Sequence, residues 1–516
     1  MREVSINISK VRTKTELMEL IGQELGFPEY YGKNLDALYD CLNEIGEPTE
    51  VAFEGVCECR ESSAEMEEYL EKLARVLEDA TGENENLTFV MIEESEELDT
   101  RIGRMENMET IRFRDLNKQY EILGEEIDAA IKNVCEEGVF IGGTQVKELE
   151  RELAEYVGVK HCITCANGTD ALVVPLMCWG IGPGDAVFVP DFTFFATGEA
   201  VSFCGATPIF IDVSPDTFNI EPRLLEREIK RVKEEGILNP RAVIAVDLFG
   251  LPASMNVIKE ICEENGLYLL EDGAQGFGGS INGKMACSFG DISTTSFFPA
   301  KPLGCYGDGG AIFTDNDEWA DLIRSICVHG KGDNKYDNVR IGMNSRLDSI
   351  QAAILRVKLN AFIENELEQV NRVADAYRFA FKLRFGEGTS RLWLPRIPDG
   401  YRSSYAQFTL RFADEETRDG VKAYLDEKGI PTVVYYPKPL HSQEAFGVSD
   451  EYGLDVTVSN KLSKTVLSVP MGPYVEAKAI TMVVDSIWEY FGKPEAEENL
   501  NPFPVFDTSN TEYGTR

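Results

Sequence analysis

From about residue 110 onward, segments with the hydrophobic period of a helix alternate with short, unbroken apolar runs. The helical segments begin with YEILGEEIDAAIKNV at 120–134, and the apolar runs are AVFVP (186–190), ATPIFIDV (206–213), AVIAVDLFG (242–250) and LYLLEDGAQ (267–275). Strands that are apolar throughout are buried on both faces, which is typical of a parallel sheet covered by helices. The pattern therefore predicts an α/β fold with a mainly parallel sheet.

The first 95 residues have a pattern of their own. REVSINI (2–8) alternates as a strand does, and TKTELMELIGQELG (13–26) places Leu17, Leu20, Ile21 and Leu25 on one helical face before Gly26. NLDALYDCLNEIG (34–46) and SSAEMEEYLEKLARVLEDA (62–80) predict two more helices, and LTFVMI (87–92) predicts a strand. These elements predict a separate small α/β unit.

Changes of pattern divide the chain. The segment EESEELDTRIGRMENME (93–109) is charged and aperiodic, which is typical of a linker. Beyond about 360 a long helix leads into a smaller α+β region with SSYAQFTLRF (403–412) and GIPTVVYYPKPLH (429–441). We therefore predict a small domain at 1–95, a linker at 96–109, a large domain at 110–360, a C-terminal small domain at 361–495 and a disordered tail at 496–516.

Composition is that of a soluble globular protein. Of 516 residues, 43% are apolar and 27% are charged, and no stretch of 18 apolar residues predicts a membrane span. The first ten residues lack the apolar core of a signal peptide. The twelve cysteines show no regular spacing, so we expect reduced thiols and a cytoplasmic protein.

One Cys-x-x-Cys pair, Cys162 and Cys165, occurs in HCITCANGTD. A structural zinc site needs about four ligands, and no second pair stands at metal-binding spacing, so no metal is expected. Buried structural thiols and a redox pair both remain open, and the first is favoured.

The formal net charge of −39 argues against sequence-independent nucleic-acid binding, which needs Lys and Arg to neutralise phosphates. The acidic residues are unevenly distributed along the chain. Residues 1–100 hold 26 acidic and 8 basic side chains and so carry −18 of the net charge of −39. A solvated acidic surface and a surface for a basic partner both fit this distribution.

A lysine stands in an unusual place in SFFPAKPLGCYGDGG (296–310), between apolar residues and a glycine-rich turn. A catalytic lysine must be deprotonated part of the time, which desolvation favours. Lys301 has the apolar flanks for this role, although a lysine can also lay its stem over aromatic rings and keep its ammonium in water.

Other groups along the chain suit the same ligand. Gly168 and Thr169 open an apparent helix, where main-chain N–H groups favour a phosphate, although Asn-Gly-Thr also makes a plain helix cap. Asp272 and Gln275 follow an apolar strand, where ligands bind in such sheets, although Asp272 could also cap the next helix. Phe194 offers a flat ring for stacking, although such aromatic residues also occur in the core. A phosphate cradle, a carboxylate, a ring and an amine are together the contacts that pyridoxal 5′-phosphate needs.

Six motifs in order resemble the DegT/DnrJ/EryC1/StrS family of sugar aminotransferases, which have fold type I of the pyridoxal-phosphate enzymes. They are GTDAL (168–172), PDFTFFAT (190–197), EDGAQGFGG (271–279), SFFPAKPLGCYGDGG (296–310), NSRLDSIQAAIL (344–355) and PTVVYYPKPLH (431–441). Within the family, the chain is most similar to UDP-2-acetamido-2-deoxy-3-oxoglucuronate aminotransferases of surface-polysaccharide pathways. The resemblance implies transfer of an amino group, with glutamate as donor, to a nucleotide-linked keto-sugar.

The resemblance also implies roles for individual residues. Lys301 would form the Schiff base with the cofactor and Asp272 would hold the pyridine nitrogen protonated. Phe194 would stack on the ring and Gln275 would lie near its 3-hydroxyl. The phosphate would be held by Gly168, Thr169 and Ser296.

Further implied contacts concern the substrate and a second subunit. Asn344 matches an asparagine that reaches the phosphate from the neighbouring subunit, which implies a homodimer with a shared active site. Arg346 is a candidate for binding a carboxylate, and His329, Tyr435 and Tyr436 are candidates for substrate contacts. Tyr435 stands where relatives often have histidine. Of the other histidines, His161 is interpreted as structural and His441 as a surface residue rather than a substrate contact.

The upstream stretch FPEYYGKNLDALYDCL (27–42) resembles barstar, an intracellular inhibitor of a secreted ribonuclease, and the resemblance covers residues 1–95. The ribonuclease-binding positions of barstar match Tyr30, Asp36, Asp40 and, more weakly, Glu78. Asp36 and Asp40 are spaced i, i+4, so they share a helical face. Lys33 replaces an acidic residue of barstar. A ribonuclease partner and a docking or solubility module both remain open.

Two hypotheses of different kinds follow for the whole chain. In the first it is an aminotransferase with a barstar-like appendage. In the second it is a binding or inhibitor protein that uses an inactive aminotransferase fold as a scaffold. The presence of Lys301, Asp272 and the phosphate-binding residues favours the enzyme.

Overall fold

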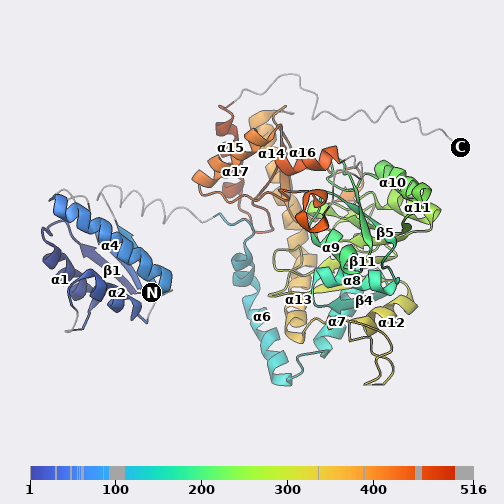
Figure 1. Ribbon diagram of the computed structural model, residues 1–516, viewed down its shortest axis with the longest axis horizontal. Helices are drawn as coiled ribbons and strands as arrows, with labels where there is room; N and C mark the ends of the chain where they lie inside the picture. The colour runs from blue at the N-terminus through green and yellow to red at the C-terminus, as the bar shows by residue number, and fades with distance from the viewer. Residues whose placement is uncertain are drawn as a thin grey trace. The chain divides into compact units, whose positions relative to one another are not determined.

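The computed structural model describes residues 2–28, 32–46, 49–54, 56, 59, 63–84, 86–91, 111–334, 336–386, 390–447 and 456–493. The chain divides into two compact units, Met1–Thr110 and Ile111–Arg516. The predicted linker at 96–109 and the predicted tail at 496–516 lie outside the described residues. Each unit is described by itself below (Figure 1).

The first unit is a three-stranded parallel sheet with helices. The strands β1 (Arg2–Asn7), β2 (Thr49–Glu54) and β3 (Leu87–Met91) lie in the order β1-β2-β3. The helices are α1 (Lys14–Leu25), α2 (Leu35–Asn43) and α4 (Ala64–Glu83). The five elements predicted here are confirmed. The central strand β2 escaped prediction, although the buried Val51 and Phe53 alternate with more polar residues.

Local chemistry fixes the ends of α1. The Thr13 side chain accepts a hydrogen bond from the Glu16 N–H, and the Glu16 carboxylate accepts one from the Thr13 N–H, which forms a capping box. At the other end Gly26 takes a left-handed conformation with φ 72°, which costs glycine little. Leu17, Ile21 and Leu25 face the core, as the pattern predicts.

The second unit is built on a seven-stranded sheet with the order β4-β12-β11-β8-β7-β5-β6. Only β12 (Gly310–Thr314) runs antiparallel to its neighbours. The other strands are β4 (His161–Cys165), β5 (Asp185–Pro190), β6 (Thr207–Ile211), β7 (Asn239–Val246), β8 (Tyr268–Asp272) and β11 (Ile292–Ser296). The predicted α/β fold with a mainly parallel sheet is confirmed.

Helices cover both faces of this sheet. As a result, alternate side chains of one strand pack into two different hydrophobic cores. Val187 and Val189 of β5 pack with α8 (Gly168–Cys178), α9 (Ala196–Phe203) and α12 (Asp317–Ile326). Ala186 and Phe188 of the same strand pack with α10 (Pro222–Glu235) and α11 (Met255–Asn265), which lie together in Figure 1. Burial on both faces explains the unbroken apolar runs.

The remaining elements complete the second unit. α6 (Leu116–Glu137) and α7 (Thr144–Val157) pack against α13 (Ser349–Ala361), which continues through a π-helical turn (Phe362–Glu366) into α14 (Leu367–Phe385). An antiparallel sheet of β13 (Leu392–Trp393), β15 (Phe408–Phe412) and β16 (Val466–Val469) packs with α15 (Glu415–Glu427), α16 (Thr457–Thr465) and α17 (Ala477–Tyr490). The short elements are β9 (Ser280–Ile281), β10 (Lys284–Met285), β14 (Tyr401–Arg402), η1 (Leu248–Gly250), η3 (Leu440–Ser442) and η4 (Glu444–Phe446).

The domain boundary predicted at residue 360 falls at the end of α13, within the continuous helix formed by α13, the π-helical turn and α14 (Figure 1). The division into large and small domains stays a prediction. None of the helices in the described part of the chain is long and apolar enough to cross a membrane.

Candidate active site

The carboxyl ends of two neighbouring parallel strands bring the central residues together. Asp272 is the last residue of β8 and pairs with Thr294 of β11, while Ser296 ends β11. Lys301 follows in a loop whose ends are closed by main-chain bonds, from Phe297 N–H to the Gly309 oxygen (2.8 Å) and from Cys305 N–H to the Phe297 oxygen (2.8 Å). The motif therefore places the lysine at the edge of the sheet where ligands bind.

Charge and burial act on Lys301 and Asp272 in opposite directions. Burial lowers the pKa of the Lys301 amine, the negative charge of Asp272 raises it, and the positive charge of Arg114 lowers it further. Burial raises the pKa of Asp272, while the Ala274 N–H (3.1 Å) and the Lys301 charge lower it. Lys301 is partly buried, and burial is the main cause of the lowered pKa of its amine, which favours a desolvated lysine over one with its ammonium held out in water.

The predicted phosphate residues meet at the start of α8. The helix begins at Gly168, and its cap Asn167 accepts a hydrogen bond from the Asp170 N–H (2.8 Å). A Cβ added at Gly168 would lie 2.6 Å from the Cβ of Ser296, so only glycine allows Ser296 to approach the helix start this closely. Main-chain N–H groups of the first helical turn, including that of Thr169, have no partner within the helix, and the Ser296 side chain lies beside the helix start, an arrangement that suits a phosphate.

Aromatic and amide groups stand around the same edge. Phe194 is 54% exposed, and its ring centroid lies 6.1 Å from that of Tyr436. Gln275 accepts a hydrogen bond from the Phe249 N–H (2.7 Å) and donates one to the Tyr436 hydroxyl (3.0 Å). The structure therefore joins Gln275 and Tyr436, which the sequence analysis assigned to cofactor and substrate separately.

Sequence reasoning missed three charged groups near Asp272 and Lys301. Glu271 is fully buried and accepts hydrogen bonds from Cys287 N–H (2.8 Å), Phe289 N–H (2.7 Å) and the Ser293 hydroxyl (2.7 Å). Burial and the neighbouring Glu271 raise the pKa of the buried Asp247. The third group is Arg114, which donates from Nη2 to the main-chain oxygen of Lys301 (2.9 Å). Glu271 and Asp247 each follow an apolar run in the sequence, and this signal could have identified them.

The residues proposed to meet substrate or a second subunit lie on a separate segment. Asn344 and Arg346 are exposed on either side of the fully buried Ser345, whose hydroxyl accepts a hydrogen bond from the Ala166 N–H (3.1 Å). The exposed His329 donates its N–H to the Met343 oxygen (2.8 Å). The segment thus adjoins the start of α8, but no hydrogen bond or ion pair among the described residues joins these three side chains to Lys301 or Asp272.

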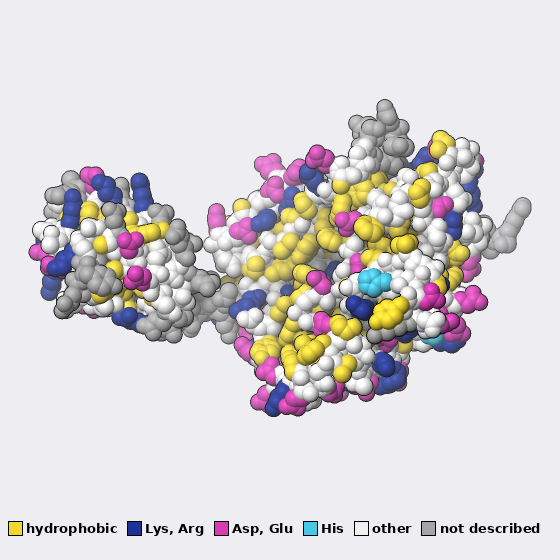
Figure 2. All heavy atoms as spheres, turned by 60° about the horizontal axis from the view of Figure 1, so that its bottom comes forward, with side chains coloured by type: hydrophobic (Ala, Val, Ile, Leu, Met, Phe, Trp, Pro, Cys, Tyr) yellow, Lys and Arg dark blue, Asp and Glu magenta, His cyan; other side chains and the backbone are white. Residues whose placement is uncertain are grey.

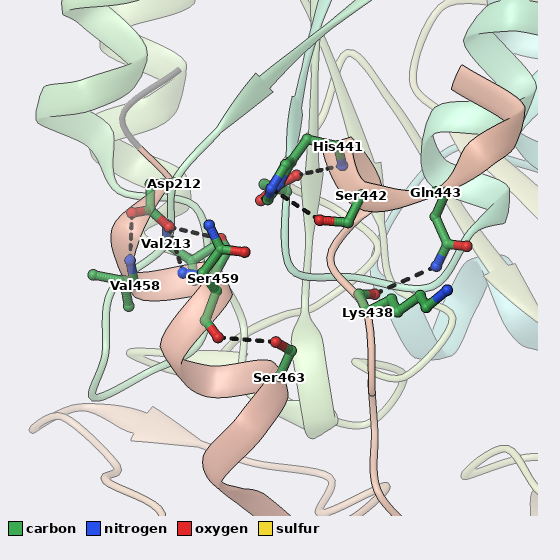
Figure 3. Close-up of polar contacts among 11 residues, drawn as sticks. Asp212, Val213, Lys438, His441, Ser442, Gln443, Val458, Ser459 and Ser463 are labelled. Atoms are coloured by element: carbon green, nitrogen blue, oxygen red, sulfur yellow. Dashed lines mark hydrogen bonds and ion pairs between the residues drawn. The ribbon is translucent and has the colours of Figure 1, made fainter. Parts of the chain in front are cut away.

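The surface interpretation of His441 is wrong. His441 is labelled in Figure 3. Its side chain is 17% exposed, and its Nδ1 lies 2.7 Å from the carboxylate of Asp191, which is fully buried after β5. Asp191 also accepts the His441 N–H (2.9 Å). This partner lies 250 residues away in the sequence, so the histidine looked isolated. Tyr435, the other residue of this segment singled out from the sequence, is partly buried with its ring centroid 6.1 Å from that of Phe113.

A second buried carboxylate ties the C-terminal elements to the large sheet. Asp212 follows β6 and accepts hydrogen bonds from the N–H groups of Val458 and Ser459 (2.8 Å each), which opens α16 (Figure 3). Together with Asp191, it fastens the residues around 441 and around 458 to the carboxyl ends of β5 and β6.

The cysteine pair and His161 have structural positions. Cys162 and Cys165 are three residues apart in β4 and enter different cores on opposite faces of the sheet. Both are buried and unpaired, and burial raises the pKa of both thiols, so a redox pair does not fit. His161 Nε2 lies 2.6 Å from an Asp317 oxygen, which joins β4 to α12.

The barstar-like positions are described only in part. Asp36 and Asp40 both lie in α2, and Asp40 is exposed. Tyr30, like the side chains of Asp36 and Glu78, lies outside the described residues. Lys33 forms an ion pair with Glu19 (2.8 Å).

Comparisons with known proteins identify relatives of both parts of the chain. Residues 121–488 match the DegT/DnrJ/EryC1/StrS aminotransferase family, and residues 1–93 match Barstar (barnase inhibitor). The UDP-2-acetamido-2-deoxy-3-oxo-D-glucuronate aminotransferase of Pseudomonas aeruginosa is 44% identical over 373 residues, 72% of this chain and 98% of that protein. Both resemblances drawn from motifs are confirmed.

Solved structures show the same relationship. A DegT DnrJ EryC1 StrS aminotransferase from Brucella abortus is 48% identical with a TM-score of 0.70, covering 74% of this chain and all (100%) of its own. DesV of S. venezuelae, solved in complex with a ketimine intermediate, is 32% identical with a TM-score of 0.69, covering 75% and 100%. The chain therefore belongs to the DegT/DnrJ/EryC1/StrS family of pyridoxal-phosphate-dependent sugar aminotransferases and carries a barstar-like domain at its amino terminus.

Proposed function

We propose that the chain transfers an amino group from glutamate to the keto carbon of a nucleotide-linked sugar of the 3-oxoglucuronate type. The observation that carries this proposal is the placement of Asp272 and Lys301 at the carboxyl ends of the neighbouring strands β8 and β11, with Ser296 beside the start of α8. The similarity to the Pseudomonas aeruginosa enzyme supports the sugar. The scaffold hypothesis is not favoured, because none of these groups has been lost.

The described residues fit pyridoxal phosphate. Gly168, Thr169 and Ser296 would hold its phosphate, since Gly168 has no Cβ that would push Ser296 away from the helix start. Asp272 would hold a proton on the ring nitrogen, Phe194 would cover a ring face, and Gln275 would lie near the 3-hydroxyl. When bound, the cofactor supplies the carbonyl that exchanges amino groups and the ring that accepts electron density.

Lys301 then does the proton chemistry. Its Nζ takes the proton from the carbon that loses the amino group and, in the second half of the cycle, returns a proton to the carbon that gains it. A base must be unprotonated to act, and burial lowers the pKa of this amine in that direction. Arg346 would bind a carboxylate of donor or sugar, with His329, Tyr435 and Tyr436 as further substrate contacts.

The second half of each active site would come from a partner subunit, with Asn344 reaching the partner's phosphate. Exposed apolar side chains support a homodimer: Val139 (47%), Phe140 (47%), Ile141 (52%), Phe298 (53%) and Ile341 (87%). Figure 2 shows apolar side chains gathered in broad patches on one face of the second unit. Large exposed apolar patches mark interaction sites.

A direct assay tests the main proposal. Purified full-length protein with pyridoxal phosphate and glutamate is offered nucleotide-linked keto-sugars that differ in the keto position and in the sugar carboxylate. We expect amino transfer to be fastest with the 3-oxo sugar acid. Activity confined to free amino acids and keto acids would refute the sugar assignment.

A second function is proposed for the amino-terminal domain, namely binding of a basic ribonuclease. The match to Barstar, the acidic excess in 1–100 and the exposed Asp40 on α2 support it. Pull-down of basic ribonucleases by the full chain at low salt tests it, because screening weakens such attraction at high salt. Asp40→Ala should weaken capture, whereas Glu24→Ala on α1 removes the same charge elsewhere and should not. No capture at low salt would end the hypothesis.

A further inference from the structure

The segment that opens the second unit is fastened beside the catalytic lysine. Ile111 is the first residue of that unit. Two residues later the Phe113 oxygen accepts a hydrogen bond from the Met471 N–H (3.0 Å), and the Phe113 ring meets the Tyr435 ring with centroids 6.1 Å apart. Asp115 then caps α6 by accepting the Lys118 N–H (2.9 Å). Arg114 is therefore held on both sides.

The guanidinium of Arg114 points to the main chain of the lysine loop. Its Nη2 donates to the Lys301 oxygen (2.9 Å) and lies 3.4 Å from the Pro302 oxygen. On the other side of the same residue, the Lys301 N–H donates to the Phe298 oxygen (2.9 Å). The backbone of Lys301 is thus bonded at its N–H and at its carbonyl, which limits where its side chain can start.

Arg114 also brings a permanent charge. Burial lowers its pKa, while Glu366 and Tyr435 raise it, but a guanidinium stays protonated in proteins. Two charged groups act on the Lys301 amine, Asp272 from β8 and Arg114 from the opening segment, and they act with opposite sign. Around Arg114 itself stand Glu366, Tyr435 and the buried Lys358.

We propose that Arg114 is a positioning residue for Lys301, which fixes the carbonyl of the lysine and sets a positive charge beside its amine. The inference rests on the proposed function for its role in catalysis, but not for the effect on the lysine itself. A positive neighbour favours the uncharged amine, the form that can take a proton. Arg114 lies 187 residues before Lys301, in the segment that opens the second unit.

The test measures the lysine in cofactor-free protein. Reaction of Lys301 with an amine-specific acylating reagent is followed by peptide mass spectrometry across pH, which gives the midpoint of its titration. Arg114→Gln removes the charge but keeps an N–H donor, and we expect its midpoint to rise by roughly half a pH unit or more. Arg114→Lys keeps the charge and should restore the wild-type midpoint. Arg112→Gln removes an exposed arginine two residues away and should change nothing.

Activity of the loaded enzyme gives the second readout. We expect Arg114→Gln to lower kcat roughly tenfold with little change in KM for the sugar, and Arg114→Lys to recover part of the loss. A Lys301 titration midpoint in Arg114→Gln that equals the wild-type value, or equal shifts in Arg112→Gln and Arg114→Gln, would overturn the proposal. If the lysine midpoint shifts as expected but no sugar is aminated, the proposed function fails and the electrostatic role of Arg114 stands.

Discussion

At the scale of single residues, the site depends on the contrast between Lys301 and Asp272. One basic and one acidic group are both pushed by burial toward their neutral forms, and each moves the other back toward its charged form. Such opposing shifts are typical of functional sites. The shift toward the neutral form matters most for the Lys301 amine, because only an unprotonated lysine can act as a nucleophile or as a base.

Replacing Lys301 by alanine should abolish turnover, by roughly a thousandfold or more, because the proton transfers lose their base. The measurement is steady-state amino transfer with glutamate and the sugar accepted by wild type. Lys438→Ala removes an exposed lysine and serves as the control. Turnover within a few-fold of wild type in Lys301→Ala would contradict the assignment.

A second lysine, Lys358 in α13, is 2% exposed, and burial lowers its pKa to about 8. In the unfolded chain this lysine keeps its ordinary pKa of 10.5. Between pH 8 and 10.5 the unfolded chain therefore binds more protons than the folded chain, so the free energy of unfolding rises with pH. Below pH 8 the buried charge costs about 3 kcal/mol. Lys358→Met should therefore melt above wild type at pH 7.5, and the gap should narrow toward pH 10.

Thermal unfolding across pH checks this expectation, with Lys132→Met as an exposed control that shows no such gap. A gap that is absent at pH 7.5, or that widens as pH rises, would be inconsistent with a buried lysine of lowered pKa.

At the scale of elements, the start of α8 decides whether a phosphate can be held. Gly168→Ala should weaken pyridoxal phosphate binding by about tenfold or more, because the new Cβ would meet Ser296 at 2.6 Å and displace the serine or the helix start. Titration of cofactor-free protein measures the affinity. Gly182→Ala has only an ordinary contact at 3.7 Å and should bind as wild type does. Equal affinities in the two variants would show that this helix start holds no phosphate.

Elements were predictable from the sequence where one local signal fixed them. The apolar runs of β5, β7 and β8 and the capped helix α1 needed no distant partner. The strand β2 is half polar and its longest unbroken apolar run is 51–53, so its pattern carried little information. His441 and Arg114 were misjudged or missed because their partners, Asp191 and Lys301, are 250 and 187 residues away. Contacts over such distances are set by the fold and leave no periodic signal.

At the scale of the whole molecule, the proposed dimer makes each site from two chains. Lys301 comes from one subunit and Asn344 from the other, so a mixed dimer of Lys301→Ala and Asn344→Ala subunits contains one site with both residues intact. Random re-pairing of equal amounts should recover about a quarter of wild-type activity, since half of the dimers are mixed and each has one good site.

The measurement is activity after joint unfolding and refolding of the two variants, each inactive or strongly impaired alone. The same variants refolded separately and then assayed together are the control. No recovery in the joint sample, with dimers confirmed by light scattering, would place Asn344 in its own subunit's site or outside any site.

The most direct test of the central claim identifies the atom that holds the cofactor. The full chain is loaded with pyridoxal phosphate, reduced with borohydride, digested and analysed by peptide mass spectrometry. We expect a pyridoxyl group on Lys301, in the peptide that contains 296–310, and none after mutation of that lysine. A group on another lysine such as Lys358, or no attachment at all, would contradict the account.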